Sequence, residues 1–295
     1  MTVARSPVAR TASATPKSAR ITVLANLKGG VGKTTVAISL ASSLGRGIPD
    51  PETAKPRIEP QHVLLIDLEP ACTASTALGI AAGGPHDSCA VLFQKPGSGV
   101  KPEEVSERLR HLTRRPENEP IDLIPADRAG VEAANGSRDS EYTFADNLRR
   151  LTSDYDHIII DLPATTRERV MRSALNAAHG VIIPVLPDTL VIRSMESTLD
   201  TIEDIRRGGN PGLRVDGWLL SRAGFRNDAD ADLTHTLLQE ESPYPTFKAR
   251  IRTLKPIQRA AAFRCSVYAL GGAQEAQRDF SDFVTEWYQG VKGTV

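Results

Sequence analysis

A glycine-rich segment at residues 28–35, with the sequence KGGVGKTT, constrains the fold of this chain more than any other feature. The apolar, β-branched run Ile21–Ala25 precedes it and predicts a strand, and Thr34–Leu44 has the apolar spacing of a helix. A strand, a glycine-rich turn and a helix in this order form the context that a phosphate-binding loop requires. The sequence therefore predicts a nucleotide-binding α/β core that begins near residue 21.

The residue types of this segment suit phosphate chemistry. Its glycines let the backbone curl so that N–H groups point at phosphate oxygens, and the positive N-terminal end of the next helix faces the same anion. Lys33 adds a charge for the β and γ phosphates, the Thr34 hydroxyl is a ligand for Mg²⁺, and Thr35 can donate to a further phosphate oxygen. The expected nucleotide-binding residues are Gly29, Gly30, Val31, Gly32, Lys33, Thr34 and Thr35.

Further short apolar runs alternate with helical patterns along the chain. The other predicted strands are His62–Leu68, Ile121–Pro125, Asp156–Leu162, Val181–Leu186 and Leu213–Leu220. The other predicted helices are Glu103–Leu112, Phe144–Leu151, Thr166–Ala178 and Leu190–Arg207. Strands that are apolar on both faces and joined by helices predict an α/β fold with a doubly wound, mostly parallel sheet flanked by helices.

Residues 1–20 differ in composition from the rest of the chain. They are rich in Ala, Ser, Thr and Pro and carry Arg5, Arg10, Lys17 and Arg20 with no acidic residue. Such a segment buries too little apolar surface to order itself, so we expect a disordered basic tail before a single P-loop domain over residues 21–295.

Composition excludes several classes of function. Basic and acidic residues balance at 36 each, so binding to nucleic acid needs a local patch. The three cysteines are far apart and form no C-x-x-C pair, which argues against a disulfide framework, a zinc site or an iron–sulfur cluster. The sequence has neither a signal peptide nor an apolar run of the roughly 18 residues that a membrane helix needs. We therefore expect a cytoplasmic protein.

The phosphate-binding segment departs from the ordinary pattern at its start. That pattern places a glycine at position 27, but Leu27 stands there and Lys28 follows. KGGVGKTT is the deviant Walker motif, and in it the chain resembles the ParA/MinD family of dimerising ATPases, above all its ParA-type partitioning members. The resemblance implies ATP hydrolysis by a sandwich homodimer in which Lys28 reaches the partner's phosphates, as an arginine finger does. A solvated loop lysine is the alternative.

Two predicted strands end in aspartates that also match the family. The segment 64–70, LLIDLEP, resembles its second motif, which implies that Asp67 orients the attacking water and approaches the metal. Glu69 stands where the family has a second aspartate, which leaves the geometry of this region open. The segment 156–163 resembles the Walker B strand, whose Asp161 would hold Mg²⁺ through water, with a helix cap as the alternative.

A basic run near the C-terminal end indicates a partner. Residues 242–274 contain no Asp or Glu, and Pro256 is well placed to begin a helix there. The candidate DNA-binding residues in this run are Lys248, Arg250, Arg252, Lys255 and Arg259. The resemblance implies nonspecific DNA binding, association with the nucleoid, and a ParB-like adaptor for a plasmid, chromosome or protein cargo. A solvated charged face is the alternative.

The second hypothesis is a MinD-like, membrane-associated positioning ATPase. It would need a basic amphipathic helix at the C-terminus, and an apolar stripe does recur there at helical spacing: Phe280, Phe283, Val284, Trp287 and Val291. Acidic residues beside the stripe, Asp279, Asp282 and Glu286, oppose binding to anionic lipid. We therefore interpret the stripe as core packing and expect no membrane partner. A scaffold or metal-insertion role without DNA stays open.

Overall fold

The structure, a computed structural model, describes residues 18–53, 55–136, 140–164, 169–188, 191–224 and 228–292. Its strands are β1 Arg20–Leu24, β2 Val63–Asp67, β3 Asp122–Ile124, β4 His157–Asp161, β5 Gly180–Val185, β6 Arg214–Ala223 and β7 Ile251–Arg252. They form one sheet in the order β3-β2-β4-β1-β5-β6-β7, and every pairing is parallel. The predicted doubly wound α/β fold is therefore confirmed.

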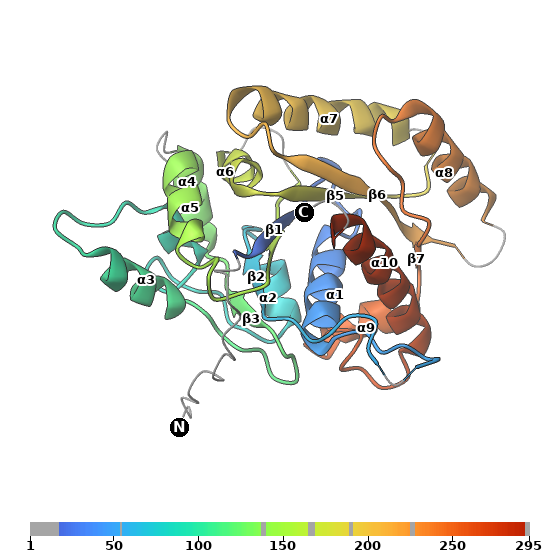
Figure 1. The fold of residues 1–295 in the computed structure, drawn as a ribbon, viewed down its shortest axis with the longest axis horizontal. Coiled ribbons are helices and arrows are strands. Elements are labelled where there is room, and N and C mark those ends of the chain that lie inside the picture. Colours follow the sequence, from blue (N-terminus) through green and yellow to red (C-terminus); the bar gives the residue numbers. More distant parts are fainter. Residues whose placement is uncertain are drawn as a thin grey trace.

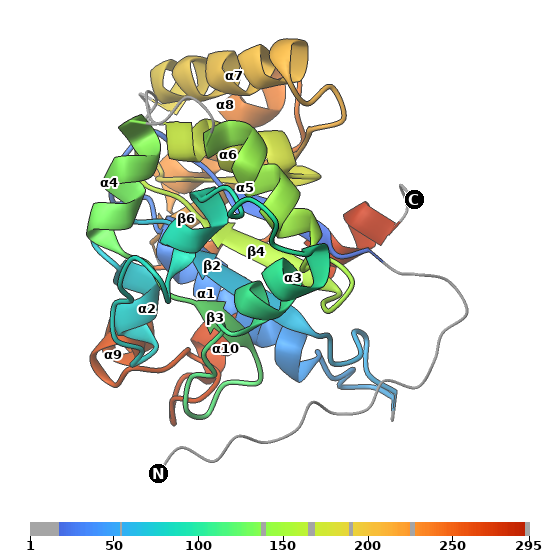
Figure 2. The same ribbon diagram turned by 90° about the vertical axis from the view of Figure 1, so that its left-hand side faces the viewer.

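Helices cover both faces of the sheet (Figures 1 and 2). One face carries α1 Lys33–Arg46, α2 Thr73–Ala77, α9 Lys255–Ala262 and α10 Gln274–Lys292. The other carries η1 Cys89–Phe93, α3 Pro102–Arg110, α4 Arg128–Gly136, α5 Ser140–Arg149, α6 Arg169–Ala177, α7 Val191–Gly208 and α8 Ala229–Glu241. Because parallel strands need helical crossovers, this layering buries the sheet on both sides.

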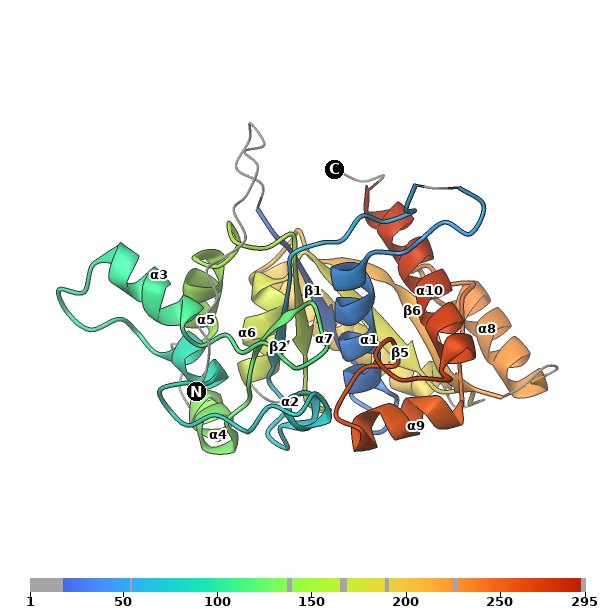
Figure 3. The same ribbon diagram turned by 90° about the horizontal axis from the view of Figure 1, so that it is seen from below.

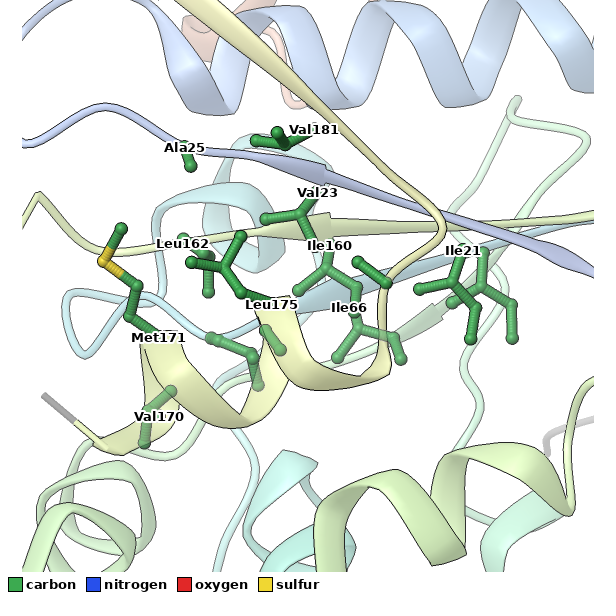
Figure 4. Close-up of a cluster of buried hydrophobic side chains, with 14 of the residues drawn as sticks. Ile21, Val23, Ala25, Ile66, Ile160, Leu162, Val170, Met171, Leu175 and Val181 are labelled. Carbon is green, nitrogen blue, oxygen red and sulfur yellow. The ribbon is translucent and has the colours of Figure 1, made fainter. Parts of the chain in front are cut away.

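The apolar side chains of each strand alternate between two hydrophobic cores. In β4, Ile160 belongs to the core under α6, while Ile159 belongs to the core under α1. Val23 and Ile160 lie above Met171 and Leu175 of α6 (Figure 4). Burial of the sheet on both faces thus explains why the strand sequences are largely apolar and do not alternate between apolar and polar residues.

Most predicted elements are present, with boundaries shifted by a few residues. The two-residue strand β7 was not predicted, because so short a segment shows no periodicity. Helices α2, α4 and α8 were not predicted either; the apolar residues of α8 have only a weak helical periodicity, and its first turn holds the acidic residues Asp230 and Asp232. The first residues of the predicted helix Thr166–Ala178 lie outside the described residues.

The boundary of the predicted tail needs a correction. Residues 1–17 lie outside the described residues, but Arg20 lies in β1. Its Nη2 atom is 2.7 Å from Oδ1 of Asp216, and Oδ2 of the same carboxylate accepts a hydrogen bond from Nε1 of Trp287 at 2.9 Å. A Cβ at Gly180 would lie 2.5 Å from both members of the ion pair, so only glycine fits there. Arg20 is ordered because a buried carboxylate on β6 pairs with it.

The C-terminal apolar stripe packs in the core, as predicted. Phe280, Phe283, Val284, Trp287 and Val291 are all buried in α10. This helix lies side by side with α1 (Figure 3). The helices of the described residues are each too short or too polar to cross a lipid bilayer.

The ion pair between Arg20 and Asp216 gives a test of this fold. Asp216→Ala should lower the free energy of unfolding by about 3 kcal/mol, because it leaves the Arg20 guanidinium and the Trp287 N–H without their acceptor. Asp146→Ala removes the partner of Arg149 in a pair whose side chains are 67% and 70% exposed, and should change stability by less than about 0.5 kcal/mol. Denaturant unfolding measures both, and equal effects would contradict the structural role of Asp216.

Candidate functional site

The glycine-rich segment forms a turn between β1 and α1, as predicted. Gly30 has φ +74° and Gly32 has φ +87°, in the left-handed region that glycine adopts without strain. Gly32 is also the N-cap of α1, which begins at Lys33. The turn and the positive end of α1 therefore face the same space, as an anion site requires.

Asn26, which the sequence did not single out, holds this turn against the sheet. Its side-chain amide donates to the Pro184 carbonyl of β5 at 2.7 Å, and its Oδ1 accepts the Lys28 N–H at 2.8 Å. Its own carbonyl accepts a hydrogen bond from Nζ of Lys33 at 3.0 Å. The side chain of one buried residue thus fixes the start of the phosphate-binding segment, and its backbone carbonyl holds the Lys33 ammonium.

Lys33 is buried, with 7% of its surface exposed. Burial lowers the pKa of Lys33, against the opposing attraction of the Asp161 and Glu69 carboxylates. Its Nζ donates hydrogen bonds to the backbone carbonyls of Asn26 at 3.0 Å and Lys28 at 3.4 Å. The ammonium therefore lies beside the glycine turn, where a phosphate would meet it.

The turn forms one wall of a pocket of about 460 Å³. All seven predicted nucleotide-binding residues line it: Gly29, Gly30, Val31, Gly32, Lys33, Thr34 and Thr35. The lining also includes Ser221, Arg222, Ile251, Arg252, Thr253, Leu254, Ile257, Gln258 and Ala261, of which Ser221 and Arg222 contact the glycine turn. A pocket that combines a phosphate loop with the apolar side chains of Ile251, Leu254, Ile257 and Ala261 suits a nucleotide.

Asp161 lies at the end of β4, with no exposed surface. Burial, followed by the charge of Asp67, raises the pKa of Asp161 well above its ordinary value, and the Thr34 hydroxyl and Lys33 act in the opposite direction. Neither carboxylate oxygen has a hydrogen-bond partner by strict geometry among the described residues. A buried, unpaired carboxylate beside a threonine hydroxyl fits a divalent cation, the role predicted for both residues.

Asp67 occupies the matching position on β2, paired in register with Asp161, but its oxygens are engaged. Oδ1 accepts the Glu69 N–H at 3.0 Å, and Oδ2 accepts the N–H and hydroxyl of Ser75 at 2.8 and 2.7 Å. Burial raises the pKa of Asp67, and these hydrogen bonds oppose the shift. Asp67 does not line the pocket, whereas Glu69 does. Asp67 therefore holds the loop after β2 through these hydrogen bonds, while Glu69 is the carboxylate of this segment that lines the pocket, and the catalytic role of Asp67 stays a prediction.

Lys28 lies outside the pocket lining of its own chain. Its side chain is exposed and is not part of the pocket lining, and its Nζ lies 2.8 Å from Oδ2 of Asp188, beyond the end of β5. The backbone N–H of Asp188 in turn donates to the buried Thr234 hydroxyl of α8 at 3.0 Å. The two lysines of the motif thus have different environments, one inside the pocket and one outside it.

The predicted basic residues divide into two groups. Arg250 forms an ion pair with Asp232, and Arg252 forms one with Asp279 at 2.8 Å, which ties β7 to α10. By contrast Lys248, Lys255 and Arg259 are exposed, and no ion pair joins them to an acidic residue in the described part of the chain. The sequence treats all five residues alike as candidates for binding DNA. In the structure, Arg250 and Arg252 already pair with carboxylates of this chain, which makes them weaker candidates than the other three.

Comparisons with known proteins agree with this site. The family described as AAA domain (AAA_31) matches residues 19–215. The chromosome partitioning protein ParA of Myxococcus xanthus is 30% identical over 237 residues, which cover 79% of this chain and 73% of that protein.

Solved structures share the fold. An ATP complex of McdA from Cyanothece has a TM-score of 0.73 at 21% identity, covering 92% of this chain and 97% of its own. A cobyrinic acid a,c-diamide synthase from Mycobacterium smegmatis, solved with an ATP analogue and magnesium, has a TM-score of 0.64 at 29% identity, covering 83% and 91%. The family match, the ParA relative and the deviant Walker turn agree, and this chain belongs to the ParA/MinD family of P-loop ATPases.

Proposed function

We propose that this chain is a partitioning ATPase that hydrolyses ATP as a sandwich homodimer. The position of Lys28 carries the proposal: the lysine lies at the rim of the phosphate turn, exposed and outside its own pocket. A cation in that place is available to the nucleotide of a second copy that closes over the pocket. Hydrolysis to ADP and phosphate would then depend on dimerisation, because the transition-state charge needs the partner's lysine.

The other roles follow from the pocket. The N–H groups of the turn and Lys33 would hold the phosphates, and Thr34 and Asp161 would hold Mg²⁺, which neutralises phosphate charge when bound. We assign the orientation of the attacking water to Glu69 in place of Asp67, because Glu69 lines the pocket and Asp67 is committed to Ser75.

We propose that the protein binds DNA without sequence preference and is associated with the nucleoid. A ParB-like adaptor would link it to its cargo and stimulate hydrolysis. The exposed residues Lys248, Lys255 and Arg259 support the DNA part of this proposal. Lys255 and Arg259 lie on α9, whose Ile257, Gln258 and Ala261 line the nucleotide pocket. One short helix thus carries both surfaces. The alternative of a membrane-associated ATPase loses its sequence support, since the apolar stripe of α10 is buried.

Replacing Lys33 and replacing Lys28 should impair different steps, nucleotide binding in the first case and hydrolysis in the second. Lys33→Ala should abolish nucleotide binding, because it removes the charge beside the turn. Lys28→Ala should bind ATP normally but hydrolyse it at least about 100-fold more slowly, since its interaction arises chiefly in the transition state. Nucleotide-binding and phosphate-release assays separate the two, and Lys101→Ala, at an exposed lysine before α3, should match the wild type in both.

A mixing experiment tests whether Lys28 acts across the dimer. Glu69→Gln should bind ATP and supply Lys28 to a partner, while Lys28→Ala keeps Glu69 beside its own nucleotide. Mixing the two inactive variants should therefore restore part of the hydrolysis, because a mixed dimer contains one complete site. If both residues serve the same protomer, the mixture stays inactive.

Glu69 and Asp67 should also be separable. Glu69→Gln should slow hydrolysis about 100-fold or more and accumulate an ATP-bound dimer on size-exclusion chromatography with unchanged thermal stability. Asp67→Asn should instead lower stability by about 1 kcal/mol and accumulate no dimer, since an amide cannot accept all three hydrogen bonds from Glu69 and Ser75. A stable Asp67→Asn variant trapped as a dimer would return the catalytic role to Asp67.

DNA binding should require ATP and fall steeply with salt. If each protomer neutralises about three phosphates, the dimer neutralises about six, and log K against log[salt] should have a slope near −5. Lys255→Ala combined with Arg259→Ala should reduce the slope to near −2 and weaken binding equally for unrelated sequences. Arg207→Ala on α7, which lies on the other face of the sheet, is the matched control (Figure 1). Equal binding with and without ATP would contradict the mechanism.

A further inference from the structure

The carboxyl end of β6 holds an irregularity that faces the phosphate turn. The pairing of β6 with β7 shifts register between Ser221 and Ala223, so Arg222 is the extra residue of a bulge. Arg222 has φ +57°, in the left-handed region that a non-glycine residue adopts only at a cost. Bulges of this kind re-aim a side chain beside a functional site.

Hydrogen bonds from both sides hold the bulge in place. The hydroxyl of Thr253 donates to the Arg222 carbonyl at 2.9 Å, and the Thr253 N–H donates to the Ala223 carbonyl at 2.7 Å. The buried Ser221 hydroxyl bonds to the carbonyls of Val31 and Val185. The conformation of Arg222 is therefore set by its neighbours, which span the phosphate turn, β5 and the segment after β7.

This geometry directs the guanidinium of Arg222 to the pocket. Its Nη1 donates to the Gly30 carbonyl at 3.1 Å, and the residue lines the pocket beside the phosphate turn. Arg222 is exposed, and no carboxylate forms an ion pair with it in the described part of the chain. One Nη1 hydrogen bond leaves several of the five guanidinium donors for an anion. Arginine matches phosphate oxygens with a planar fork of donors.

We propose that Arg222 binds the phosphates of the nucleoside triphosphate in its own pocket while holding the Gly30 carbonyl, so that the glycine N–H groups face inward. This inference rests on the proposed function, in which the pocket binds ATP. It adds a second cation to Lys33 and explains why a strained arginine stands where glycine would be unstrained.

Substitutions at Arg222 separate the guanidinium from the backbone strain. Arg222→Gly removes the guanidinium and the backbone strain together. Arg222→Asn also removes the guanidinium and puts at this position a residue that tolerates the left-handed region. Both should weaken binding of a fluorescent ATP analogue about 10- to 100-fold, the range for loss of a hydrogen bond to a charged group, while the melting temperature stays equal or rises. Arg264→Gly is the matched control, because Arg264 is also exposed with φ +55° but lies outside the pocket lining. The Arg264→Gly variant should bind the ATP analogue with wild-type affinity.

Two further variants identify the role of the charge. Arg222→Lys should recover part of the affinity, whereas Arg222→Gln, which can still donate to Gly30, should not. Wild-type affinity in Arg222→Gln would limit the residue to holding the turn and overturn the phosphate contact. Wild-type affinity in Arg222→Gly, which can make neither contact, would overturn both parts of the proposal. Failure of the wild-type protein to bind the analogue would instead refute the proposed ATPase.

Discussion

Two buried carboxylates side by side impose the main electrostatic constraint on this molecule. Asp67 and Asp161 end paired strands in register, and both are fully buried. Asp67 is compensated by hydrogen bonds from Ser75 and Glu69, whereas Asp161 has none by strict geometry in the described part of the chain. Lys33 and the Thr34 hydroxyl favour the ionised form of Asp161 against burial and the charge of Asp67, and a bound cation would compensate the buried negative charge further.

The pocket joins segments that are far apart in the chain. The phosphate turn comes from residues 29–35, and a further wall comes from residues 221–222 and from several residues between 251 and 261. Helix α9 belongs to this wall and presents Lys255 and Arg259 to solvent on its exposed side. A shift of α9 on nucleotide binding would therefore move the proposed DNA contacts, which gives a direct physical route between the two ligands.

The ion pairs of the basic run show why a charge pattern alone is a weak guide to binding. Arg252 lies within a run that lacks acidic residues, yet Asp279 on α10 pairs with it across the fold. Arg250 is paired in the same way with Asp232 on α8. Both partners are distant in sequence, so the run loses two of its apparent free charges only after the chain folds.

The sequence by itself determined the parallel α/β class, the phosphate turn and the strand-end aspartates, because each depends on local periodicity or on glycines with φ above zero. It also determined that the C-terminal stripe is core packing. The tertiary structure decided that Glu69 and not Asp67 lines the pocket, that Arg222 is aimed at Gly30 by a bulge, and that two of the five basic residues are neutralised. These features depend on partners far away in sequence, whose positions only the packed sheet and helices establish.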